Sequence, residues 1–155
     1  LIHQPSYNML NRWVEDDGLL NTLDDLGIGS IAFTPLAQGL LTIKYLQGVP
    51  EESRANQDKS LDRQKLTPEL VENLKALNEL ASGRGQTLAQ MALAWVLRGE
   101  RITTALIGAS SAKQVVDCAG AVDRLDFTDS ELSKVDKLSG DIGINLWAKS
   151  SETES

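Results

Sequence analysis

The chain has 155 residues, 41% hydrophobic and 24% charged, which is the composition of an ordinary globular domain with its own core. Its net charge is -7 and its lysines and arginines are scattered, so the sequence lacks the basic patches of proteins that bind nucleic acid or anionic membranes. No apolar run is long enough to span a bilayer and the first residues do not resemble a signal peptide, so we expect a cytoplasmic protein without membrane insertion.

The start of the chain predicts a strand, a helix and a second strand. Apolar runs at residues 1–4 and 29–33 are typical of buried strands. Between them, leucines at residues 19–26 share one helical face, with Asp16 or Asp17 as the expected N-cap and Gly27 as the expected left-handed stop. Because the chain starts inside an apolar strand, we expect it to be the C-terminal portion of a longer protein; a processed N-terminus is the alternative.

The rest of the chain predicts four helices and a third strand. The candidate N-caps of the helices are Thr67, Thr87, Ser110 or Ser111, and Thr128. An apolar run at residues 102–107 predicts the third strand. The polar residues 148–155 predict a flexible tail.

Strands that alternate with helices indicate an α/β fold with a parallel sheet. Three strands are too few to close a barrel, and an eight-stranded β/α barrel needs about 250 residues. The sequence therefore fits the C-terminal part of a (β/α)8 TIM barrel, about three strands and their helices, in one domain over residues 1–155. Such barrels bind ligands on the loops that follow the strands, so the long loop at residues 34–60 is a candidate site; an insertion without function is the alternative.

The loop after the third strand, "LIGASSAKQVVD" at residues 106–117, has the features of an anion site. Gly108 lets backbone approach a ligand, and a helix that begins at Ser110 or Ser111 would direct its N–H groups and positive dipole end at a phosphate. Lys113 is unfavourable in the first turn unless an anion is bound. Gln114 can close a capping box, and that structural role explains this residue equally well.

The loop after the second strand, "TPLAQGLLTIKY" at residues 34–45, also suits a ligand. Gly39 permits a tight turn, and Leu36 and Leu40 provide an apolar floor. Lys44 and, further along, Arg54 can make charge-assisted contacts to phosphates.

Two residues at strand ends can orient a planar ligand. Phe33 ends the second strand and can present its ring to a planar group; a place in the core is the alternative. Gln4, in "QPSYN", carries a side-chain amide that can fix an amide of the ligand. The residues alone thus predict a barrel fragment with two loops suited to anions, and they do not predict a reaction.

Four segments resemble a known family: "LIHQPSYNMLNRWVEDDGLL", "GIGSIAFTPLAQGLLTIKYLQGVPEESRA", "GQTLAQMALAWVL" and "ALIGASSAKQ". In this order they resemble the C-terminal half of an aldo-keto reductase. The branch that the chain resembles is that of the bacterial L-glyceraldehyde 3-phosphate reductases, which are similar to the β subunits of voltage-gated potassium channels. The resemblance covers nearly the whole chain. It implies a β/α barrel that binds NADPH in an extended form, without a Rossmann motif, and reduces aldehydes and ketones to alcohols.

The resemblance also implies which residues bind the cofactor. Gln4 resembles the glutamine that hydrogen-bonds the nicotinamide carboxamide, and Phe33 the aromatic residue that stacks on the nicotinamide. The loop along the ribose and pyrophosphate is matched by Thr34, Leu36, Ala37 and Gln38. Basic residues near the pyrophosphate and adenosine are matched by Lys44 and Arg54. The segment for the adenosine and its 2'-phosphate is matched by Gly108, Ser110, Gln114 and Asp117.

Four residues depart from the family pattern. Ile43 replaces a glycine of the loop that closes over the cofactor, and Ser111 replaces an arginine of the 2'-phosphate pocket. Asp117 and Cys118 stand where a glutamate and an asparagine meet the adenosine. These departures leave the choice between NADPH and NADH open.

The family's catalytic Asp, Tyr, Lys and His belong to its N-terminal half, so the resemblance implies no catalytic residue in this chain. Neither Tyr7 nor Lys44 is one of them, and His3, the single histidine, is expected to be structural; with one cysteine, no metal site is expected. The expected partners are a small aldehyde or ketone, the N-terminal half of the same barrel and further copies of the protein. The alternatives are a cofactor-sensing subunit without catalysis, like the channel β subunits, and an inactive half barrel.

Overall fold

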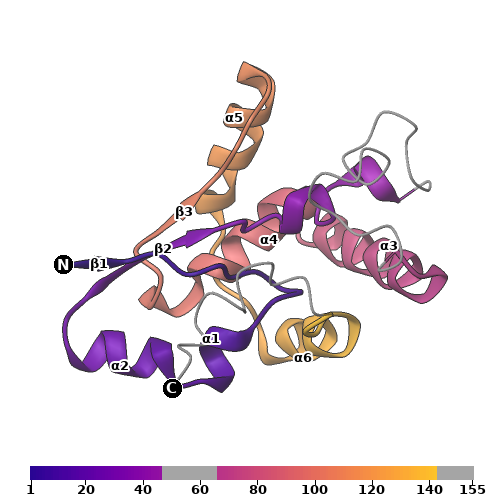
Figure 1. Cartoon of the computed structure of the whole chain (residues 1–155). Helices are drawn as coiled ribbons and strands as arrows, with labels where there is room; N and C mark the ends of the chain where they lie inside the picture. Colours follow the sequence, from indigo (N-terminus) through magenta and orange to yellow (C-terminus); the bar gives the residue numbers. More distant parts are fainter. Residues whose placement is uncertain (47–65, 143–155) are drawn as a thin grey trace.

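The computed structural model describes residues 1–46 and 66–142 of the chain (Figure 1). This part holds three strands, β1 (Ile2–His3), β2 (Gly29–Phe33) and β3 (Thr104–Leu106), in one sheet of order β1-β2-β3. Both ladders are parallel, with Ile2 opposite Gly29 and Ile31 opposite Thr104. Each strand lies inside a predicted run, and the α/β fold with a parallel sheet is confirmed.

Helices connect the strands. Among the described residues the α-helices are α1 (Trp13–Asp16), α2 (Leu19–Asp25), α3 (Pro68–Gly83), α4 (Leu88–Leu97), α5 (Ala112–Ala119) and α6 (Asp129–Leu138). The single 3₁₀ turns are η1 (Ala37–Gly39), η2 (Ile43–Tyr45), η4 (Arg98–Glu100) and η5 (Gly120–Asp123).

The helix starts follow the predicted caps. The hydroxyl of Thr67 accepts a hydrogen bond from the Leu70 N–H at 3.1 Å, with Pro68 in the first helical position. Thr87 with Gln90, and Thr128 with Glu131, form complete capping boxes. Local sequence signals therefore decide where α3, α4 and α6 begin.

The start of α2 differs from the prediction. Gly18, with a φ of +73°, is its N-cap, and no side chain caps this helix. Asp16 and Asp17 instead end α1, a single turn that the leucine pattern did not predict. A left-handed glycine reverses the chain between α1 and α2 so closely that neither aspartate can reach the N–H groups of α2. The predicted stop at Gly27 is confirmed by its φ of +62°.

One face of the sheet is closed. Ser30 and Ala32 of β2 are fully buried, and Ala32 belongs to the same core cluster as Met91 and Trp95 of α4. Eight of the ten residues of α4 are buried, because α3, α5 and the sheet surround it. The core of the described part is therefore centred on α4.

The other face of the sheet is open. Partners in a parallel ladder point to the same side, so Ile2, Ile31, Phe33 and Leu106 share this face. Ile2 is 65% exposed and Leu106 is 53% exposed. Figure 1 shows α5 directed away from the other helices, and none of its residues is buried. The described part of the chain thus has a packed helical layer on one side and an uncovered apolar face on the other.

Candidate functional site

The loops that follow the three strands leave the sheet at one edge, the carboxyl edge. The pairing of β1 with β2 resumes beyond β1, where Ser6 bridges Phe33 in the same register and the Phe33 N–H donates to the Pro5 carbonyl at 3.0 Å. Gln4 stands two residues before this bridge, with an exposed side chain. Phe33 is half-buried on the open face beside its ladder partner Leu106. Two predicted nicotinamide contacts therefore lie on neighbouring strands at the same edge.

The turn after β2 has an unusual backbone. The φ angles of Thr34, Ala37 and Gln38 are +55°, +48° and +58°, and Gly39 follows at +98°. A left-handed residue other than glycine costs about 1–2 kcal/mol, so a turn with three of them keeps its shape only where its surroundings impose it. Such strain is concentrated at ligand-binding and catalytic sites. The loop predicted to lie along the ribose and pyrophosphate is therefore a strained turn.

The loop after β1 supplies part of those surroundings. The Ser6 and Thr34 hydroxyls are 2.9 Å apart, and the Asn8 side-chain amide donates to the Thr34 carbonyl at 2.9 Å. The Asn11 amide donates to the Ser6 hydroxyl, also at 2.9 Å. Ser6, Asn8 and Asn11 are all buried. Sequence reasoning missed these three residues, although short polar residues directly after a strand are a recognisable signal for hydrogen bonding to nearby backbone.

The remainder of this loop offers polar atoms to a ligand. The Gln38 side-chain oxygen and the Tyr45 hydroxyl are buried and have no hydrogen-bond partner among the described residues. Lys44 is exposed, with its ammonium 5.8 Å from the centre of the Tyr45 ring, and Ile43 is 71% exposed. Leu36 is half-buried and Ala37 is buried. Arg54 lies outside the described residues.

An unpaired buried oxygen such as that of Gln38 is a test of whether a cofactor fits. Buried polar atoms nearly always have a partner, because an unsatisfied one costs about 1–3 kcal/mol. A ribose hydroxyl is a donor that could supply the missing hydrogen bond. A buried acceptor at Gln38 and an exposed lysine at Lys44, both in this loop, suit a sugar phosphate.

The predicted anion site lies at the corner between β3 and α5. The Ser111 hydroxyl caps α5 by accepting from the Gln114 N–H at 3.3 Å, as predicted for one of the two serines. Gln114 accepts from the N–H and the hydroxyl of Ser110, at 2.7 and 3.0 Å, rather than from the Ser111 N–H of a regular capping box. These residues, together with Gly108 and Lys113, are exposed. Within residues 1–46 and 66–142, the hydrogen bonds of this corner are local ones.

Asp117 faces α4. Its carboxylate accepts from the Thr87 hydroxyl at 3.3 Å, and its carbonyl accepts from the Gln90 amide at 2.9 Å. Partial burial, with the neighbouring Asp117 charge, raises the pKa of the half-buried Cys118 thiol. The structure thus gives Asp117 a role in docking α5 on α4, and its predicted contact with adenosine stays a prediction.

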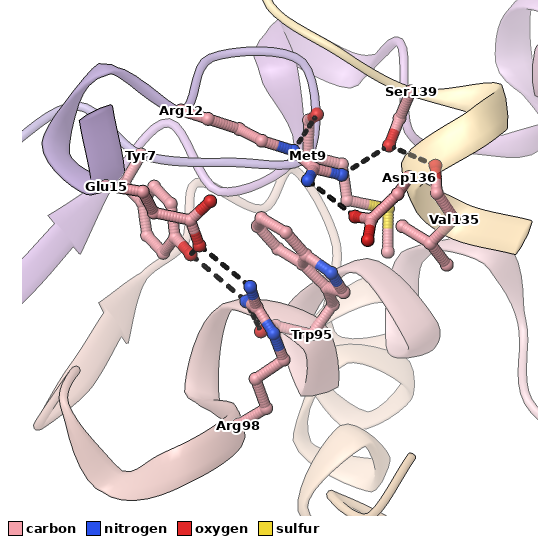
Figure 2. Close-up of polar contacts among 9 residues, drawn as sticks. All are labelled: Tyr7, Met9, Arg12, Glu15, Trp95, Arg98, Val135, Asp136 and Ser139. Carbon is pink, nitrogen blue, oxygen red and sulfur yellow. Dashed lines mark hydrogen bonds and ion pairs between the residues drawn. The ribbon is translucent and has the colours of Figure 1, made fainter. Parts of the chain in front are cut away.

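A second polar cluster lies among the helices (Figure 2). The Trp95 ring lies between the guanidinium groups of Arg98, 3.6 Å from the ring centre, and Arg12, at 4.6 Å. Arg98 also pairs with Glu15 at 2.7 Å and donates to the Tyr7 hydroxyl at 3.0 Å, while Tyr7 donates to Glu15. Burial raises the pKa of Tyr7, and Arg98 opposes this shift only in part. A buried phenol that holds its proton in a hydrogen bond to a carboxylate suits a structural role.

Neither a metal centre nor a membrane span occurs within residues 1–46 and 66–142. No three His, Cys, Asp or Glu side chains gather there in a way that could hold a metal ion. No helix of the same segments has the length and apolar character needed to cross a bilayer.

Comparisons with known proteins agree with this architecture. A model of the aldo/keto reductase family matches residues 1–139. A solved structure of a thermostable aldo-keto reductase in complex with the inhibitor epalrestat superposes with a TM-score of 0.59 at 22% identity, covering 89% of this chain and 39% of that one. At this identity the superposition supports the fold alone.

Two relatives add sequence similarity. L-glyceraldehyde 3-phosphate reductase of Escherichia coli (strain K12) is 51% identical over 156 residues, which cover 98% of this chain and 45% of that protein. A putative voltage-gated potassium channel subunit beta of Schizosaccharomyces pombe is 36% identical over 140 residues, covering 87% of this chain and 41% of that protein. The chain spans about half the length of these relatives. From the family match and these identities we conclude that the chain belongs to the aldo/keto reductase family.

Proposed function

We propose that a full-length barrel containing this chain reduces small aldehydes or ketones to alcohols with NADPH, and that this chain holds most of the cofactor. The observation that carries the proposal is Phe33, which ends β2 on the open face of the sheet and is followed directly by the strained turn at Thr34. Active sites of β/α barrels lie at this edge. The 51% identity to a bacterial reductase supports the reaction class.

Each end of the cofactor has its own contacts in this proposal. Gln4 binds the nicotinamide carboxamide and Phe33 stacks on the ring, so that one face of the nicotinamide points toward the substrate. The ribose and pyrophosphate lie along the turn formed by Thr34, Leu36, Ala37 and Gln38, beside Lys44 and Arg54. The adenosine and its 2'-phosphate meet the corner formed by Gly108, Ser110, Gln114 and Asp117.

The reaction needs a hydride and a proton. Bound NADPH would supply the hydride to the carbonyl carbon. The carbonyl oxygen takes a proton from a residue outside this chain, because the family's catalytic residues match no position here. This chain therefore orients the cofactor, and no catalytic residue is assigned to it.

The proposal includes the rest of the barrel as a partner. The open sheet face, with Ile2 and Leu106 more than half exposed, suits the packing of further strands, and α5 also carries exposed valines. The N-terminal half of the same barrel would cover both. A cytoplasmic location and a homo-oligomer belong to the same proposal.

A cofactor-sensing subunit of the channel β type is the second candidate. It is supported by identities of 30 to 36% to channel β subunits, against 51% to the reductase. The lower identity makes this function the less favoured of the two. Cofactor binding without turnover by the full-length protein would reverse this order.

The proposed function is tested on the full-length protein by titrating NADPH and by following its oxidation with small aldehydes. Replacing Phe33 with alanine should weaken NADPH binding by about tenfold, since an aromatic stack is worth about 0.5–1.5 kcal/mol beyond the area that it buries. Phe33→Tyr is the matched control, because it keeps the ring and should bind nearly as well as the original protein. Full-length protein that binds no nicotinamide cofactor would disprove the proposal.

A further inference from the structure

We propose that Ser6 and Asn8 are positioning residues, which hold Thr34 in its left-handed conformation and so shape the surface on which the cofactor lies. This inference rests on the proposed function, since it concerns how the nicotinamide end of that site is shaped. The two residues belong to the loop after β1, far from Thr34 in sequence.

The left-handed backbone conformation of Thr34 needs stabilising contacts. Its φ is +55°, and a β-branched residue avoids this region because Cβ crowds the backbone. Nothing in the sequence "FTPLAQG" calls for a left-handed residue at Thr34, whereas Gly39, five residues later, suits its own φ of +98°. Within the turn, the Ala37 N–H donates to the Thr34 carbonyl at 2.9 Å. The contacts from the loop after β1 add to this local bond and are the long-range ones that favour the left-handed conformation.

Both hydrogen-bonding groups of Thr34 that face the loop after β1 are engaged. Asn8 donates its side-chain amide to the Thr34 carbonyl at 2.9 Å, which fixes the orientation of the peptide that leads to Pro35. The Ser6 hydroxyl lies 2.9 Å from the Thr34 hydroxyl, which fixes the side chain. These two bonds hold the residue from its backbone and from its side chain at the same time.

The two positioning residues are themselves fixed. The Asn8 side-chain oxygen accepts from the Leu10 N–H at 2.9 Å, and the backbones of Asn8 and Asn11 exchange two hydrogen bonds of 3.1 Å. Asn11 donates to the Ser6 hydroxyl, and the Trp13 indole N–H donates to the Ser6 carbonyl, both at 2.9 Å. Ser6 and Asn8 are 4% and 1% exposed, so water does not compete for these bonds.

The conformation of Thr34 affects the proposed cofactor site through the backbone on either side of it. Thr34 directly follows Phe33 and begins the turn that contains Gln38, whose buried side-chain oxygen has no partner among the described residues. If the Asn8 bond is lost, Thr34 can relax toward the extended region, and both Phe33 and Gln38 shift. Ser6 and Asn8 touch neither substrate nor cofactor in this account and act only through Thr34.

The test is a double-mutant cycle on the full-length protein, with NADPH affinity measured by calorimetric titration. Asn8→Ala should weaken NADPH binding by about tenfold, and it should raise the KM for NADPH more than the KM for the aldehyde. Glycine adopts a positive φ without strain, so in a Thr34→Gly background the same Asn8→Ala change should weaken binding by less than about threefold. A purely structural role for Asn8 predicts no such rescue.

Ser139→Ala is the matched control. Ser139 is a buried serine that binds Arg12 and the Val135 carbonyl at the end of α6, so its loss lowers stability without touching Thr34. It should leave NADPH affinity within about twofold, which is the scatter expected between independent sites. If Asn8→Ala prevents folding, Ser6→Ala removes the hydroxyl contacts to Thr34 and Asn11 and keeps the Asn8 bond. It should weaken binding by about threefold, with the same rescue by Thr34→Gly.

Three outcomes would overturn the inference, and only the third would also overturn the proposed function. Unchanged NADPH affinity in a folded Asn8→Ala or Ser6→Ala variant would overturn it and leave the proposed function intact. Equal losses with the original Thr34 and in the Thr34→Gly background would do the same, because they would show that Thr34 does not mediate the effect. Absence of NADPH binding by the unaltered full-length protein would overturn the proposed function and this inference together.

Discussion

The two loops predicted to bind opposite ends of the cofactor are built in different ways. The turn after β2 is strained, partly buried and bonded to the separate loop after β1. The corner between β3 and α5 is exposed, and the side chains of Ser110, Ser111 and Gln114 form local hydrogen bonds within the corner. Packing thus shapes one end of the proposed site before any ligand binds, whereas the other end presents an open surface where charge must do more of the binding.

The difference continues beneath the loops. The loop after β1 rests on Trp95 through Tyr7, whose ring centre is 5.3 Å from the Trp95 ring, and Trp95 is fully buried. In α5, by contrast, no residue is buried. The first loop is therefore coupled directly to the core, whereas the second is joined to it through the contacts of α5 with α4.

The largest expected effect comes from breaking the packed region at Trp95. Trp95→Ala removes a buried ring and both guanidinium contacts, and it should lower the free energy of unfolding by about 4 kcal/mol. Urea unfolding of the full-length protein, followed by circular dichroism, measures this change. Lys75→Ala removes an exposed pair with Glu72 and should change stability by less than about 0.5 kcal/mol. Similar losses in both variants would contradict the comparison.

A second, smaller effect tests the packed region by pH. Partial burial opposes ionisation of Glu131, but the Thr128 N–H and the buried Arg84 outweigh it and lower the pKa of this carboxyl. A lowered pKa stabilises the fold above the unfolded-state value of about 4.3, and this stabilisation is lost as pH falls through the lower folded-state value. Glu131→Gln should therefore cost about 2 kcal/mol at pH 7 and flatten the loss of stability in acid.

The control for the pH experiment is Glu72→Gln. Glu72 is exposed and pairs with Lys75 three residues away on α3, so its replacement should leave the acid dependence of unfolding unchanged. Melting temperatures measured from neutral pH to below pH 4 provide the comparison. Parallel curves for Glu131→Gln and the unaltered protein would show that the Arg84 pair does not govern this dependence.

The smallest effect is expected at the open corner. Lys113→Met should weaken NADPH binding by about fivefold, the upper end of what an exposed charge pair contributes, and it should leave NADH binding unchanged. The thermal stability should not change, because Lys113 is exposed. Lys75→Met, which removes another exposed charge from α3, is the matched variant. Equal weakening of NADPH and NADH would show that the anion expected beside Lys113 is not the 2'-phosphate.

Sequence reasoning succeeded where structure depends on neighbouring residues. Thr67, Thr87 and Thr128 act on N–H groups within three residues, so the pattern of short polar residue, helix former and capping partner predicted three helix starts. The three strands were predicted for a similar reason, since a buried parallel strand is a short apolar run. The tight turn at Gly39 was also predicted, because glycine is the residue that permits such a backbone.

Features that depend on distant contacts were missed. The bond between Asn8 and Thr34 joins residues 26 positions apart, and no local pattern marks a threonine as left-handed. The contact of Asp117 with Thr87 is likewise a consequence of how α5 docks on α4. The predicted start of α2 was wrong for a local reason, because a left-handed Gly18, and not an aspartate, is the N-cap. The shape of a loop depends on the residues that pack against it, and hydrophobic periodicity in the sequence does not identify those residues.

The hydrogen bond from Trp13 to the Ser6 carbonyl has a spectroscopic consequence. Trp13 is only half-buried, and its indole N–H is fixed at 2.9 Å on the residue that holds Thr34. Fully buried Trp95 reports on the core, so the two indoles sample different parts of the molecule. The emission of Trp13 should therefore shift when the loop after β1 loosens, even while the core that surrounds Trp95 is intact. The chain thus carries an intrinsic fluorophore, Trp13, in the loop that is proposed to hold Thr34 in place for the cofactor.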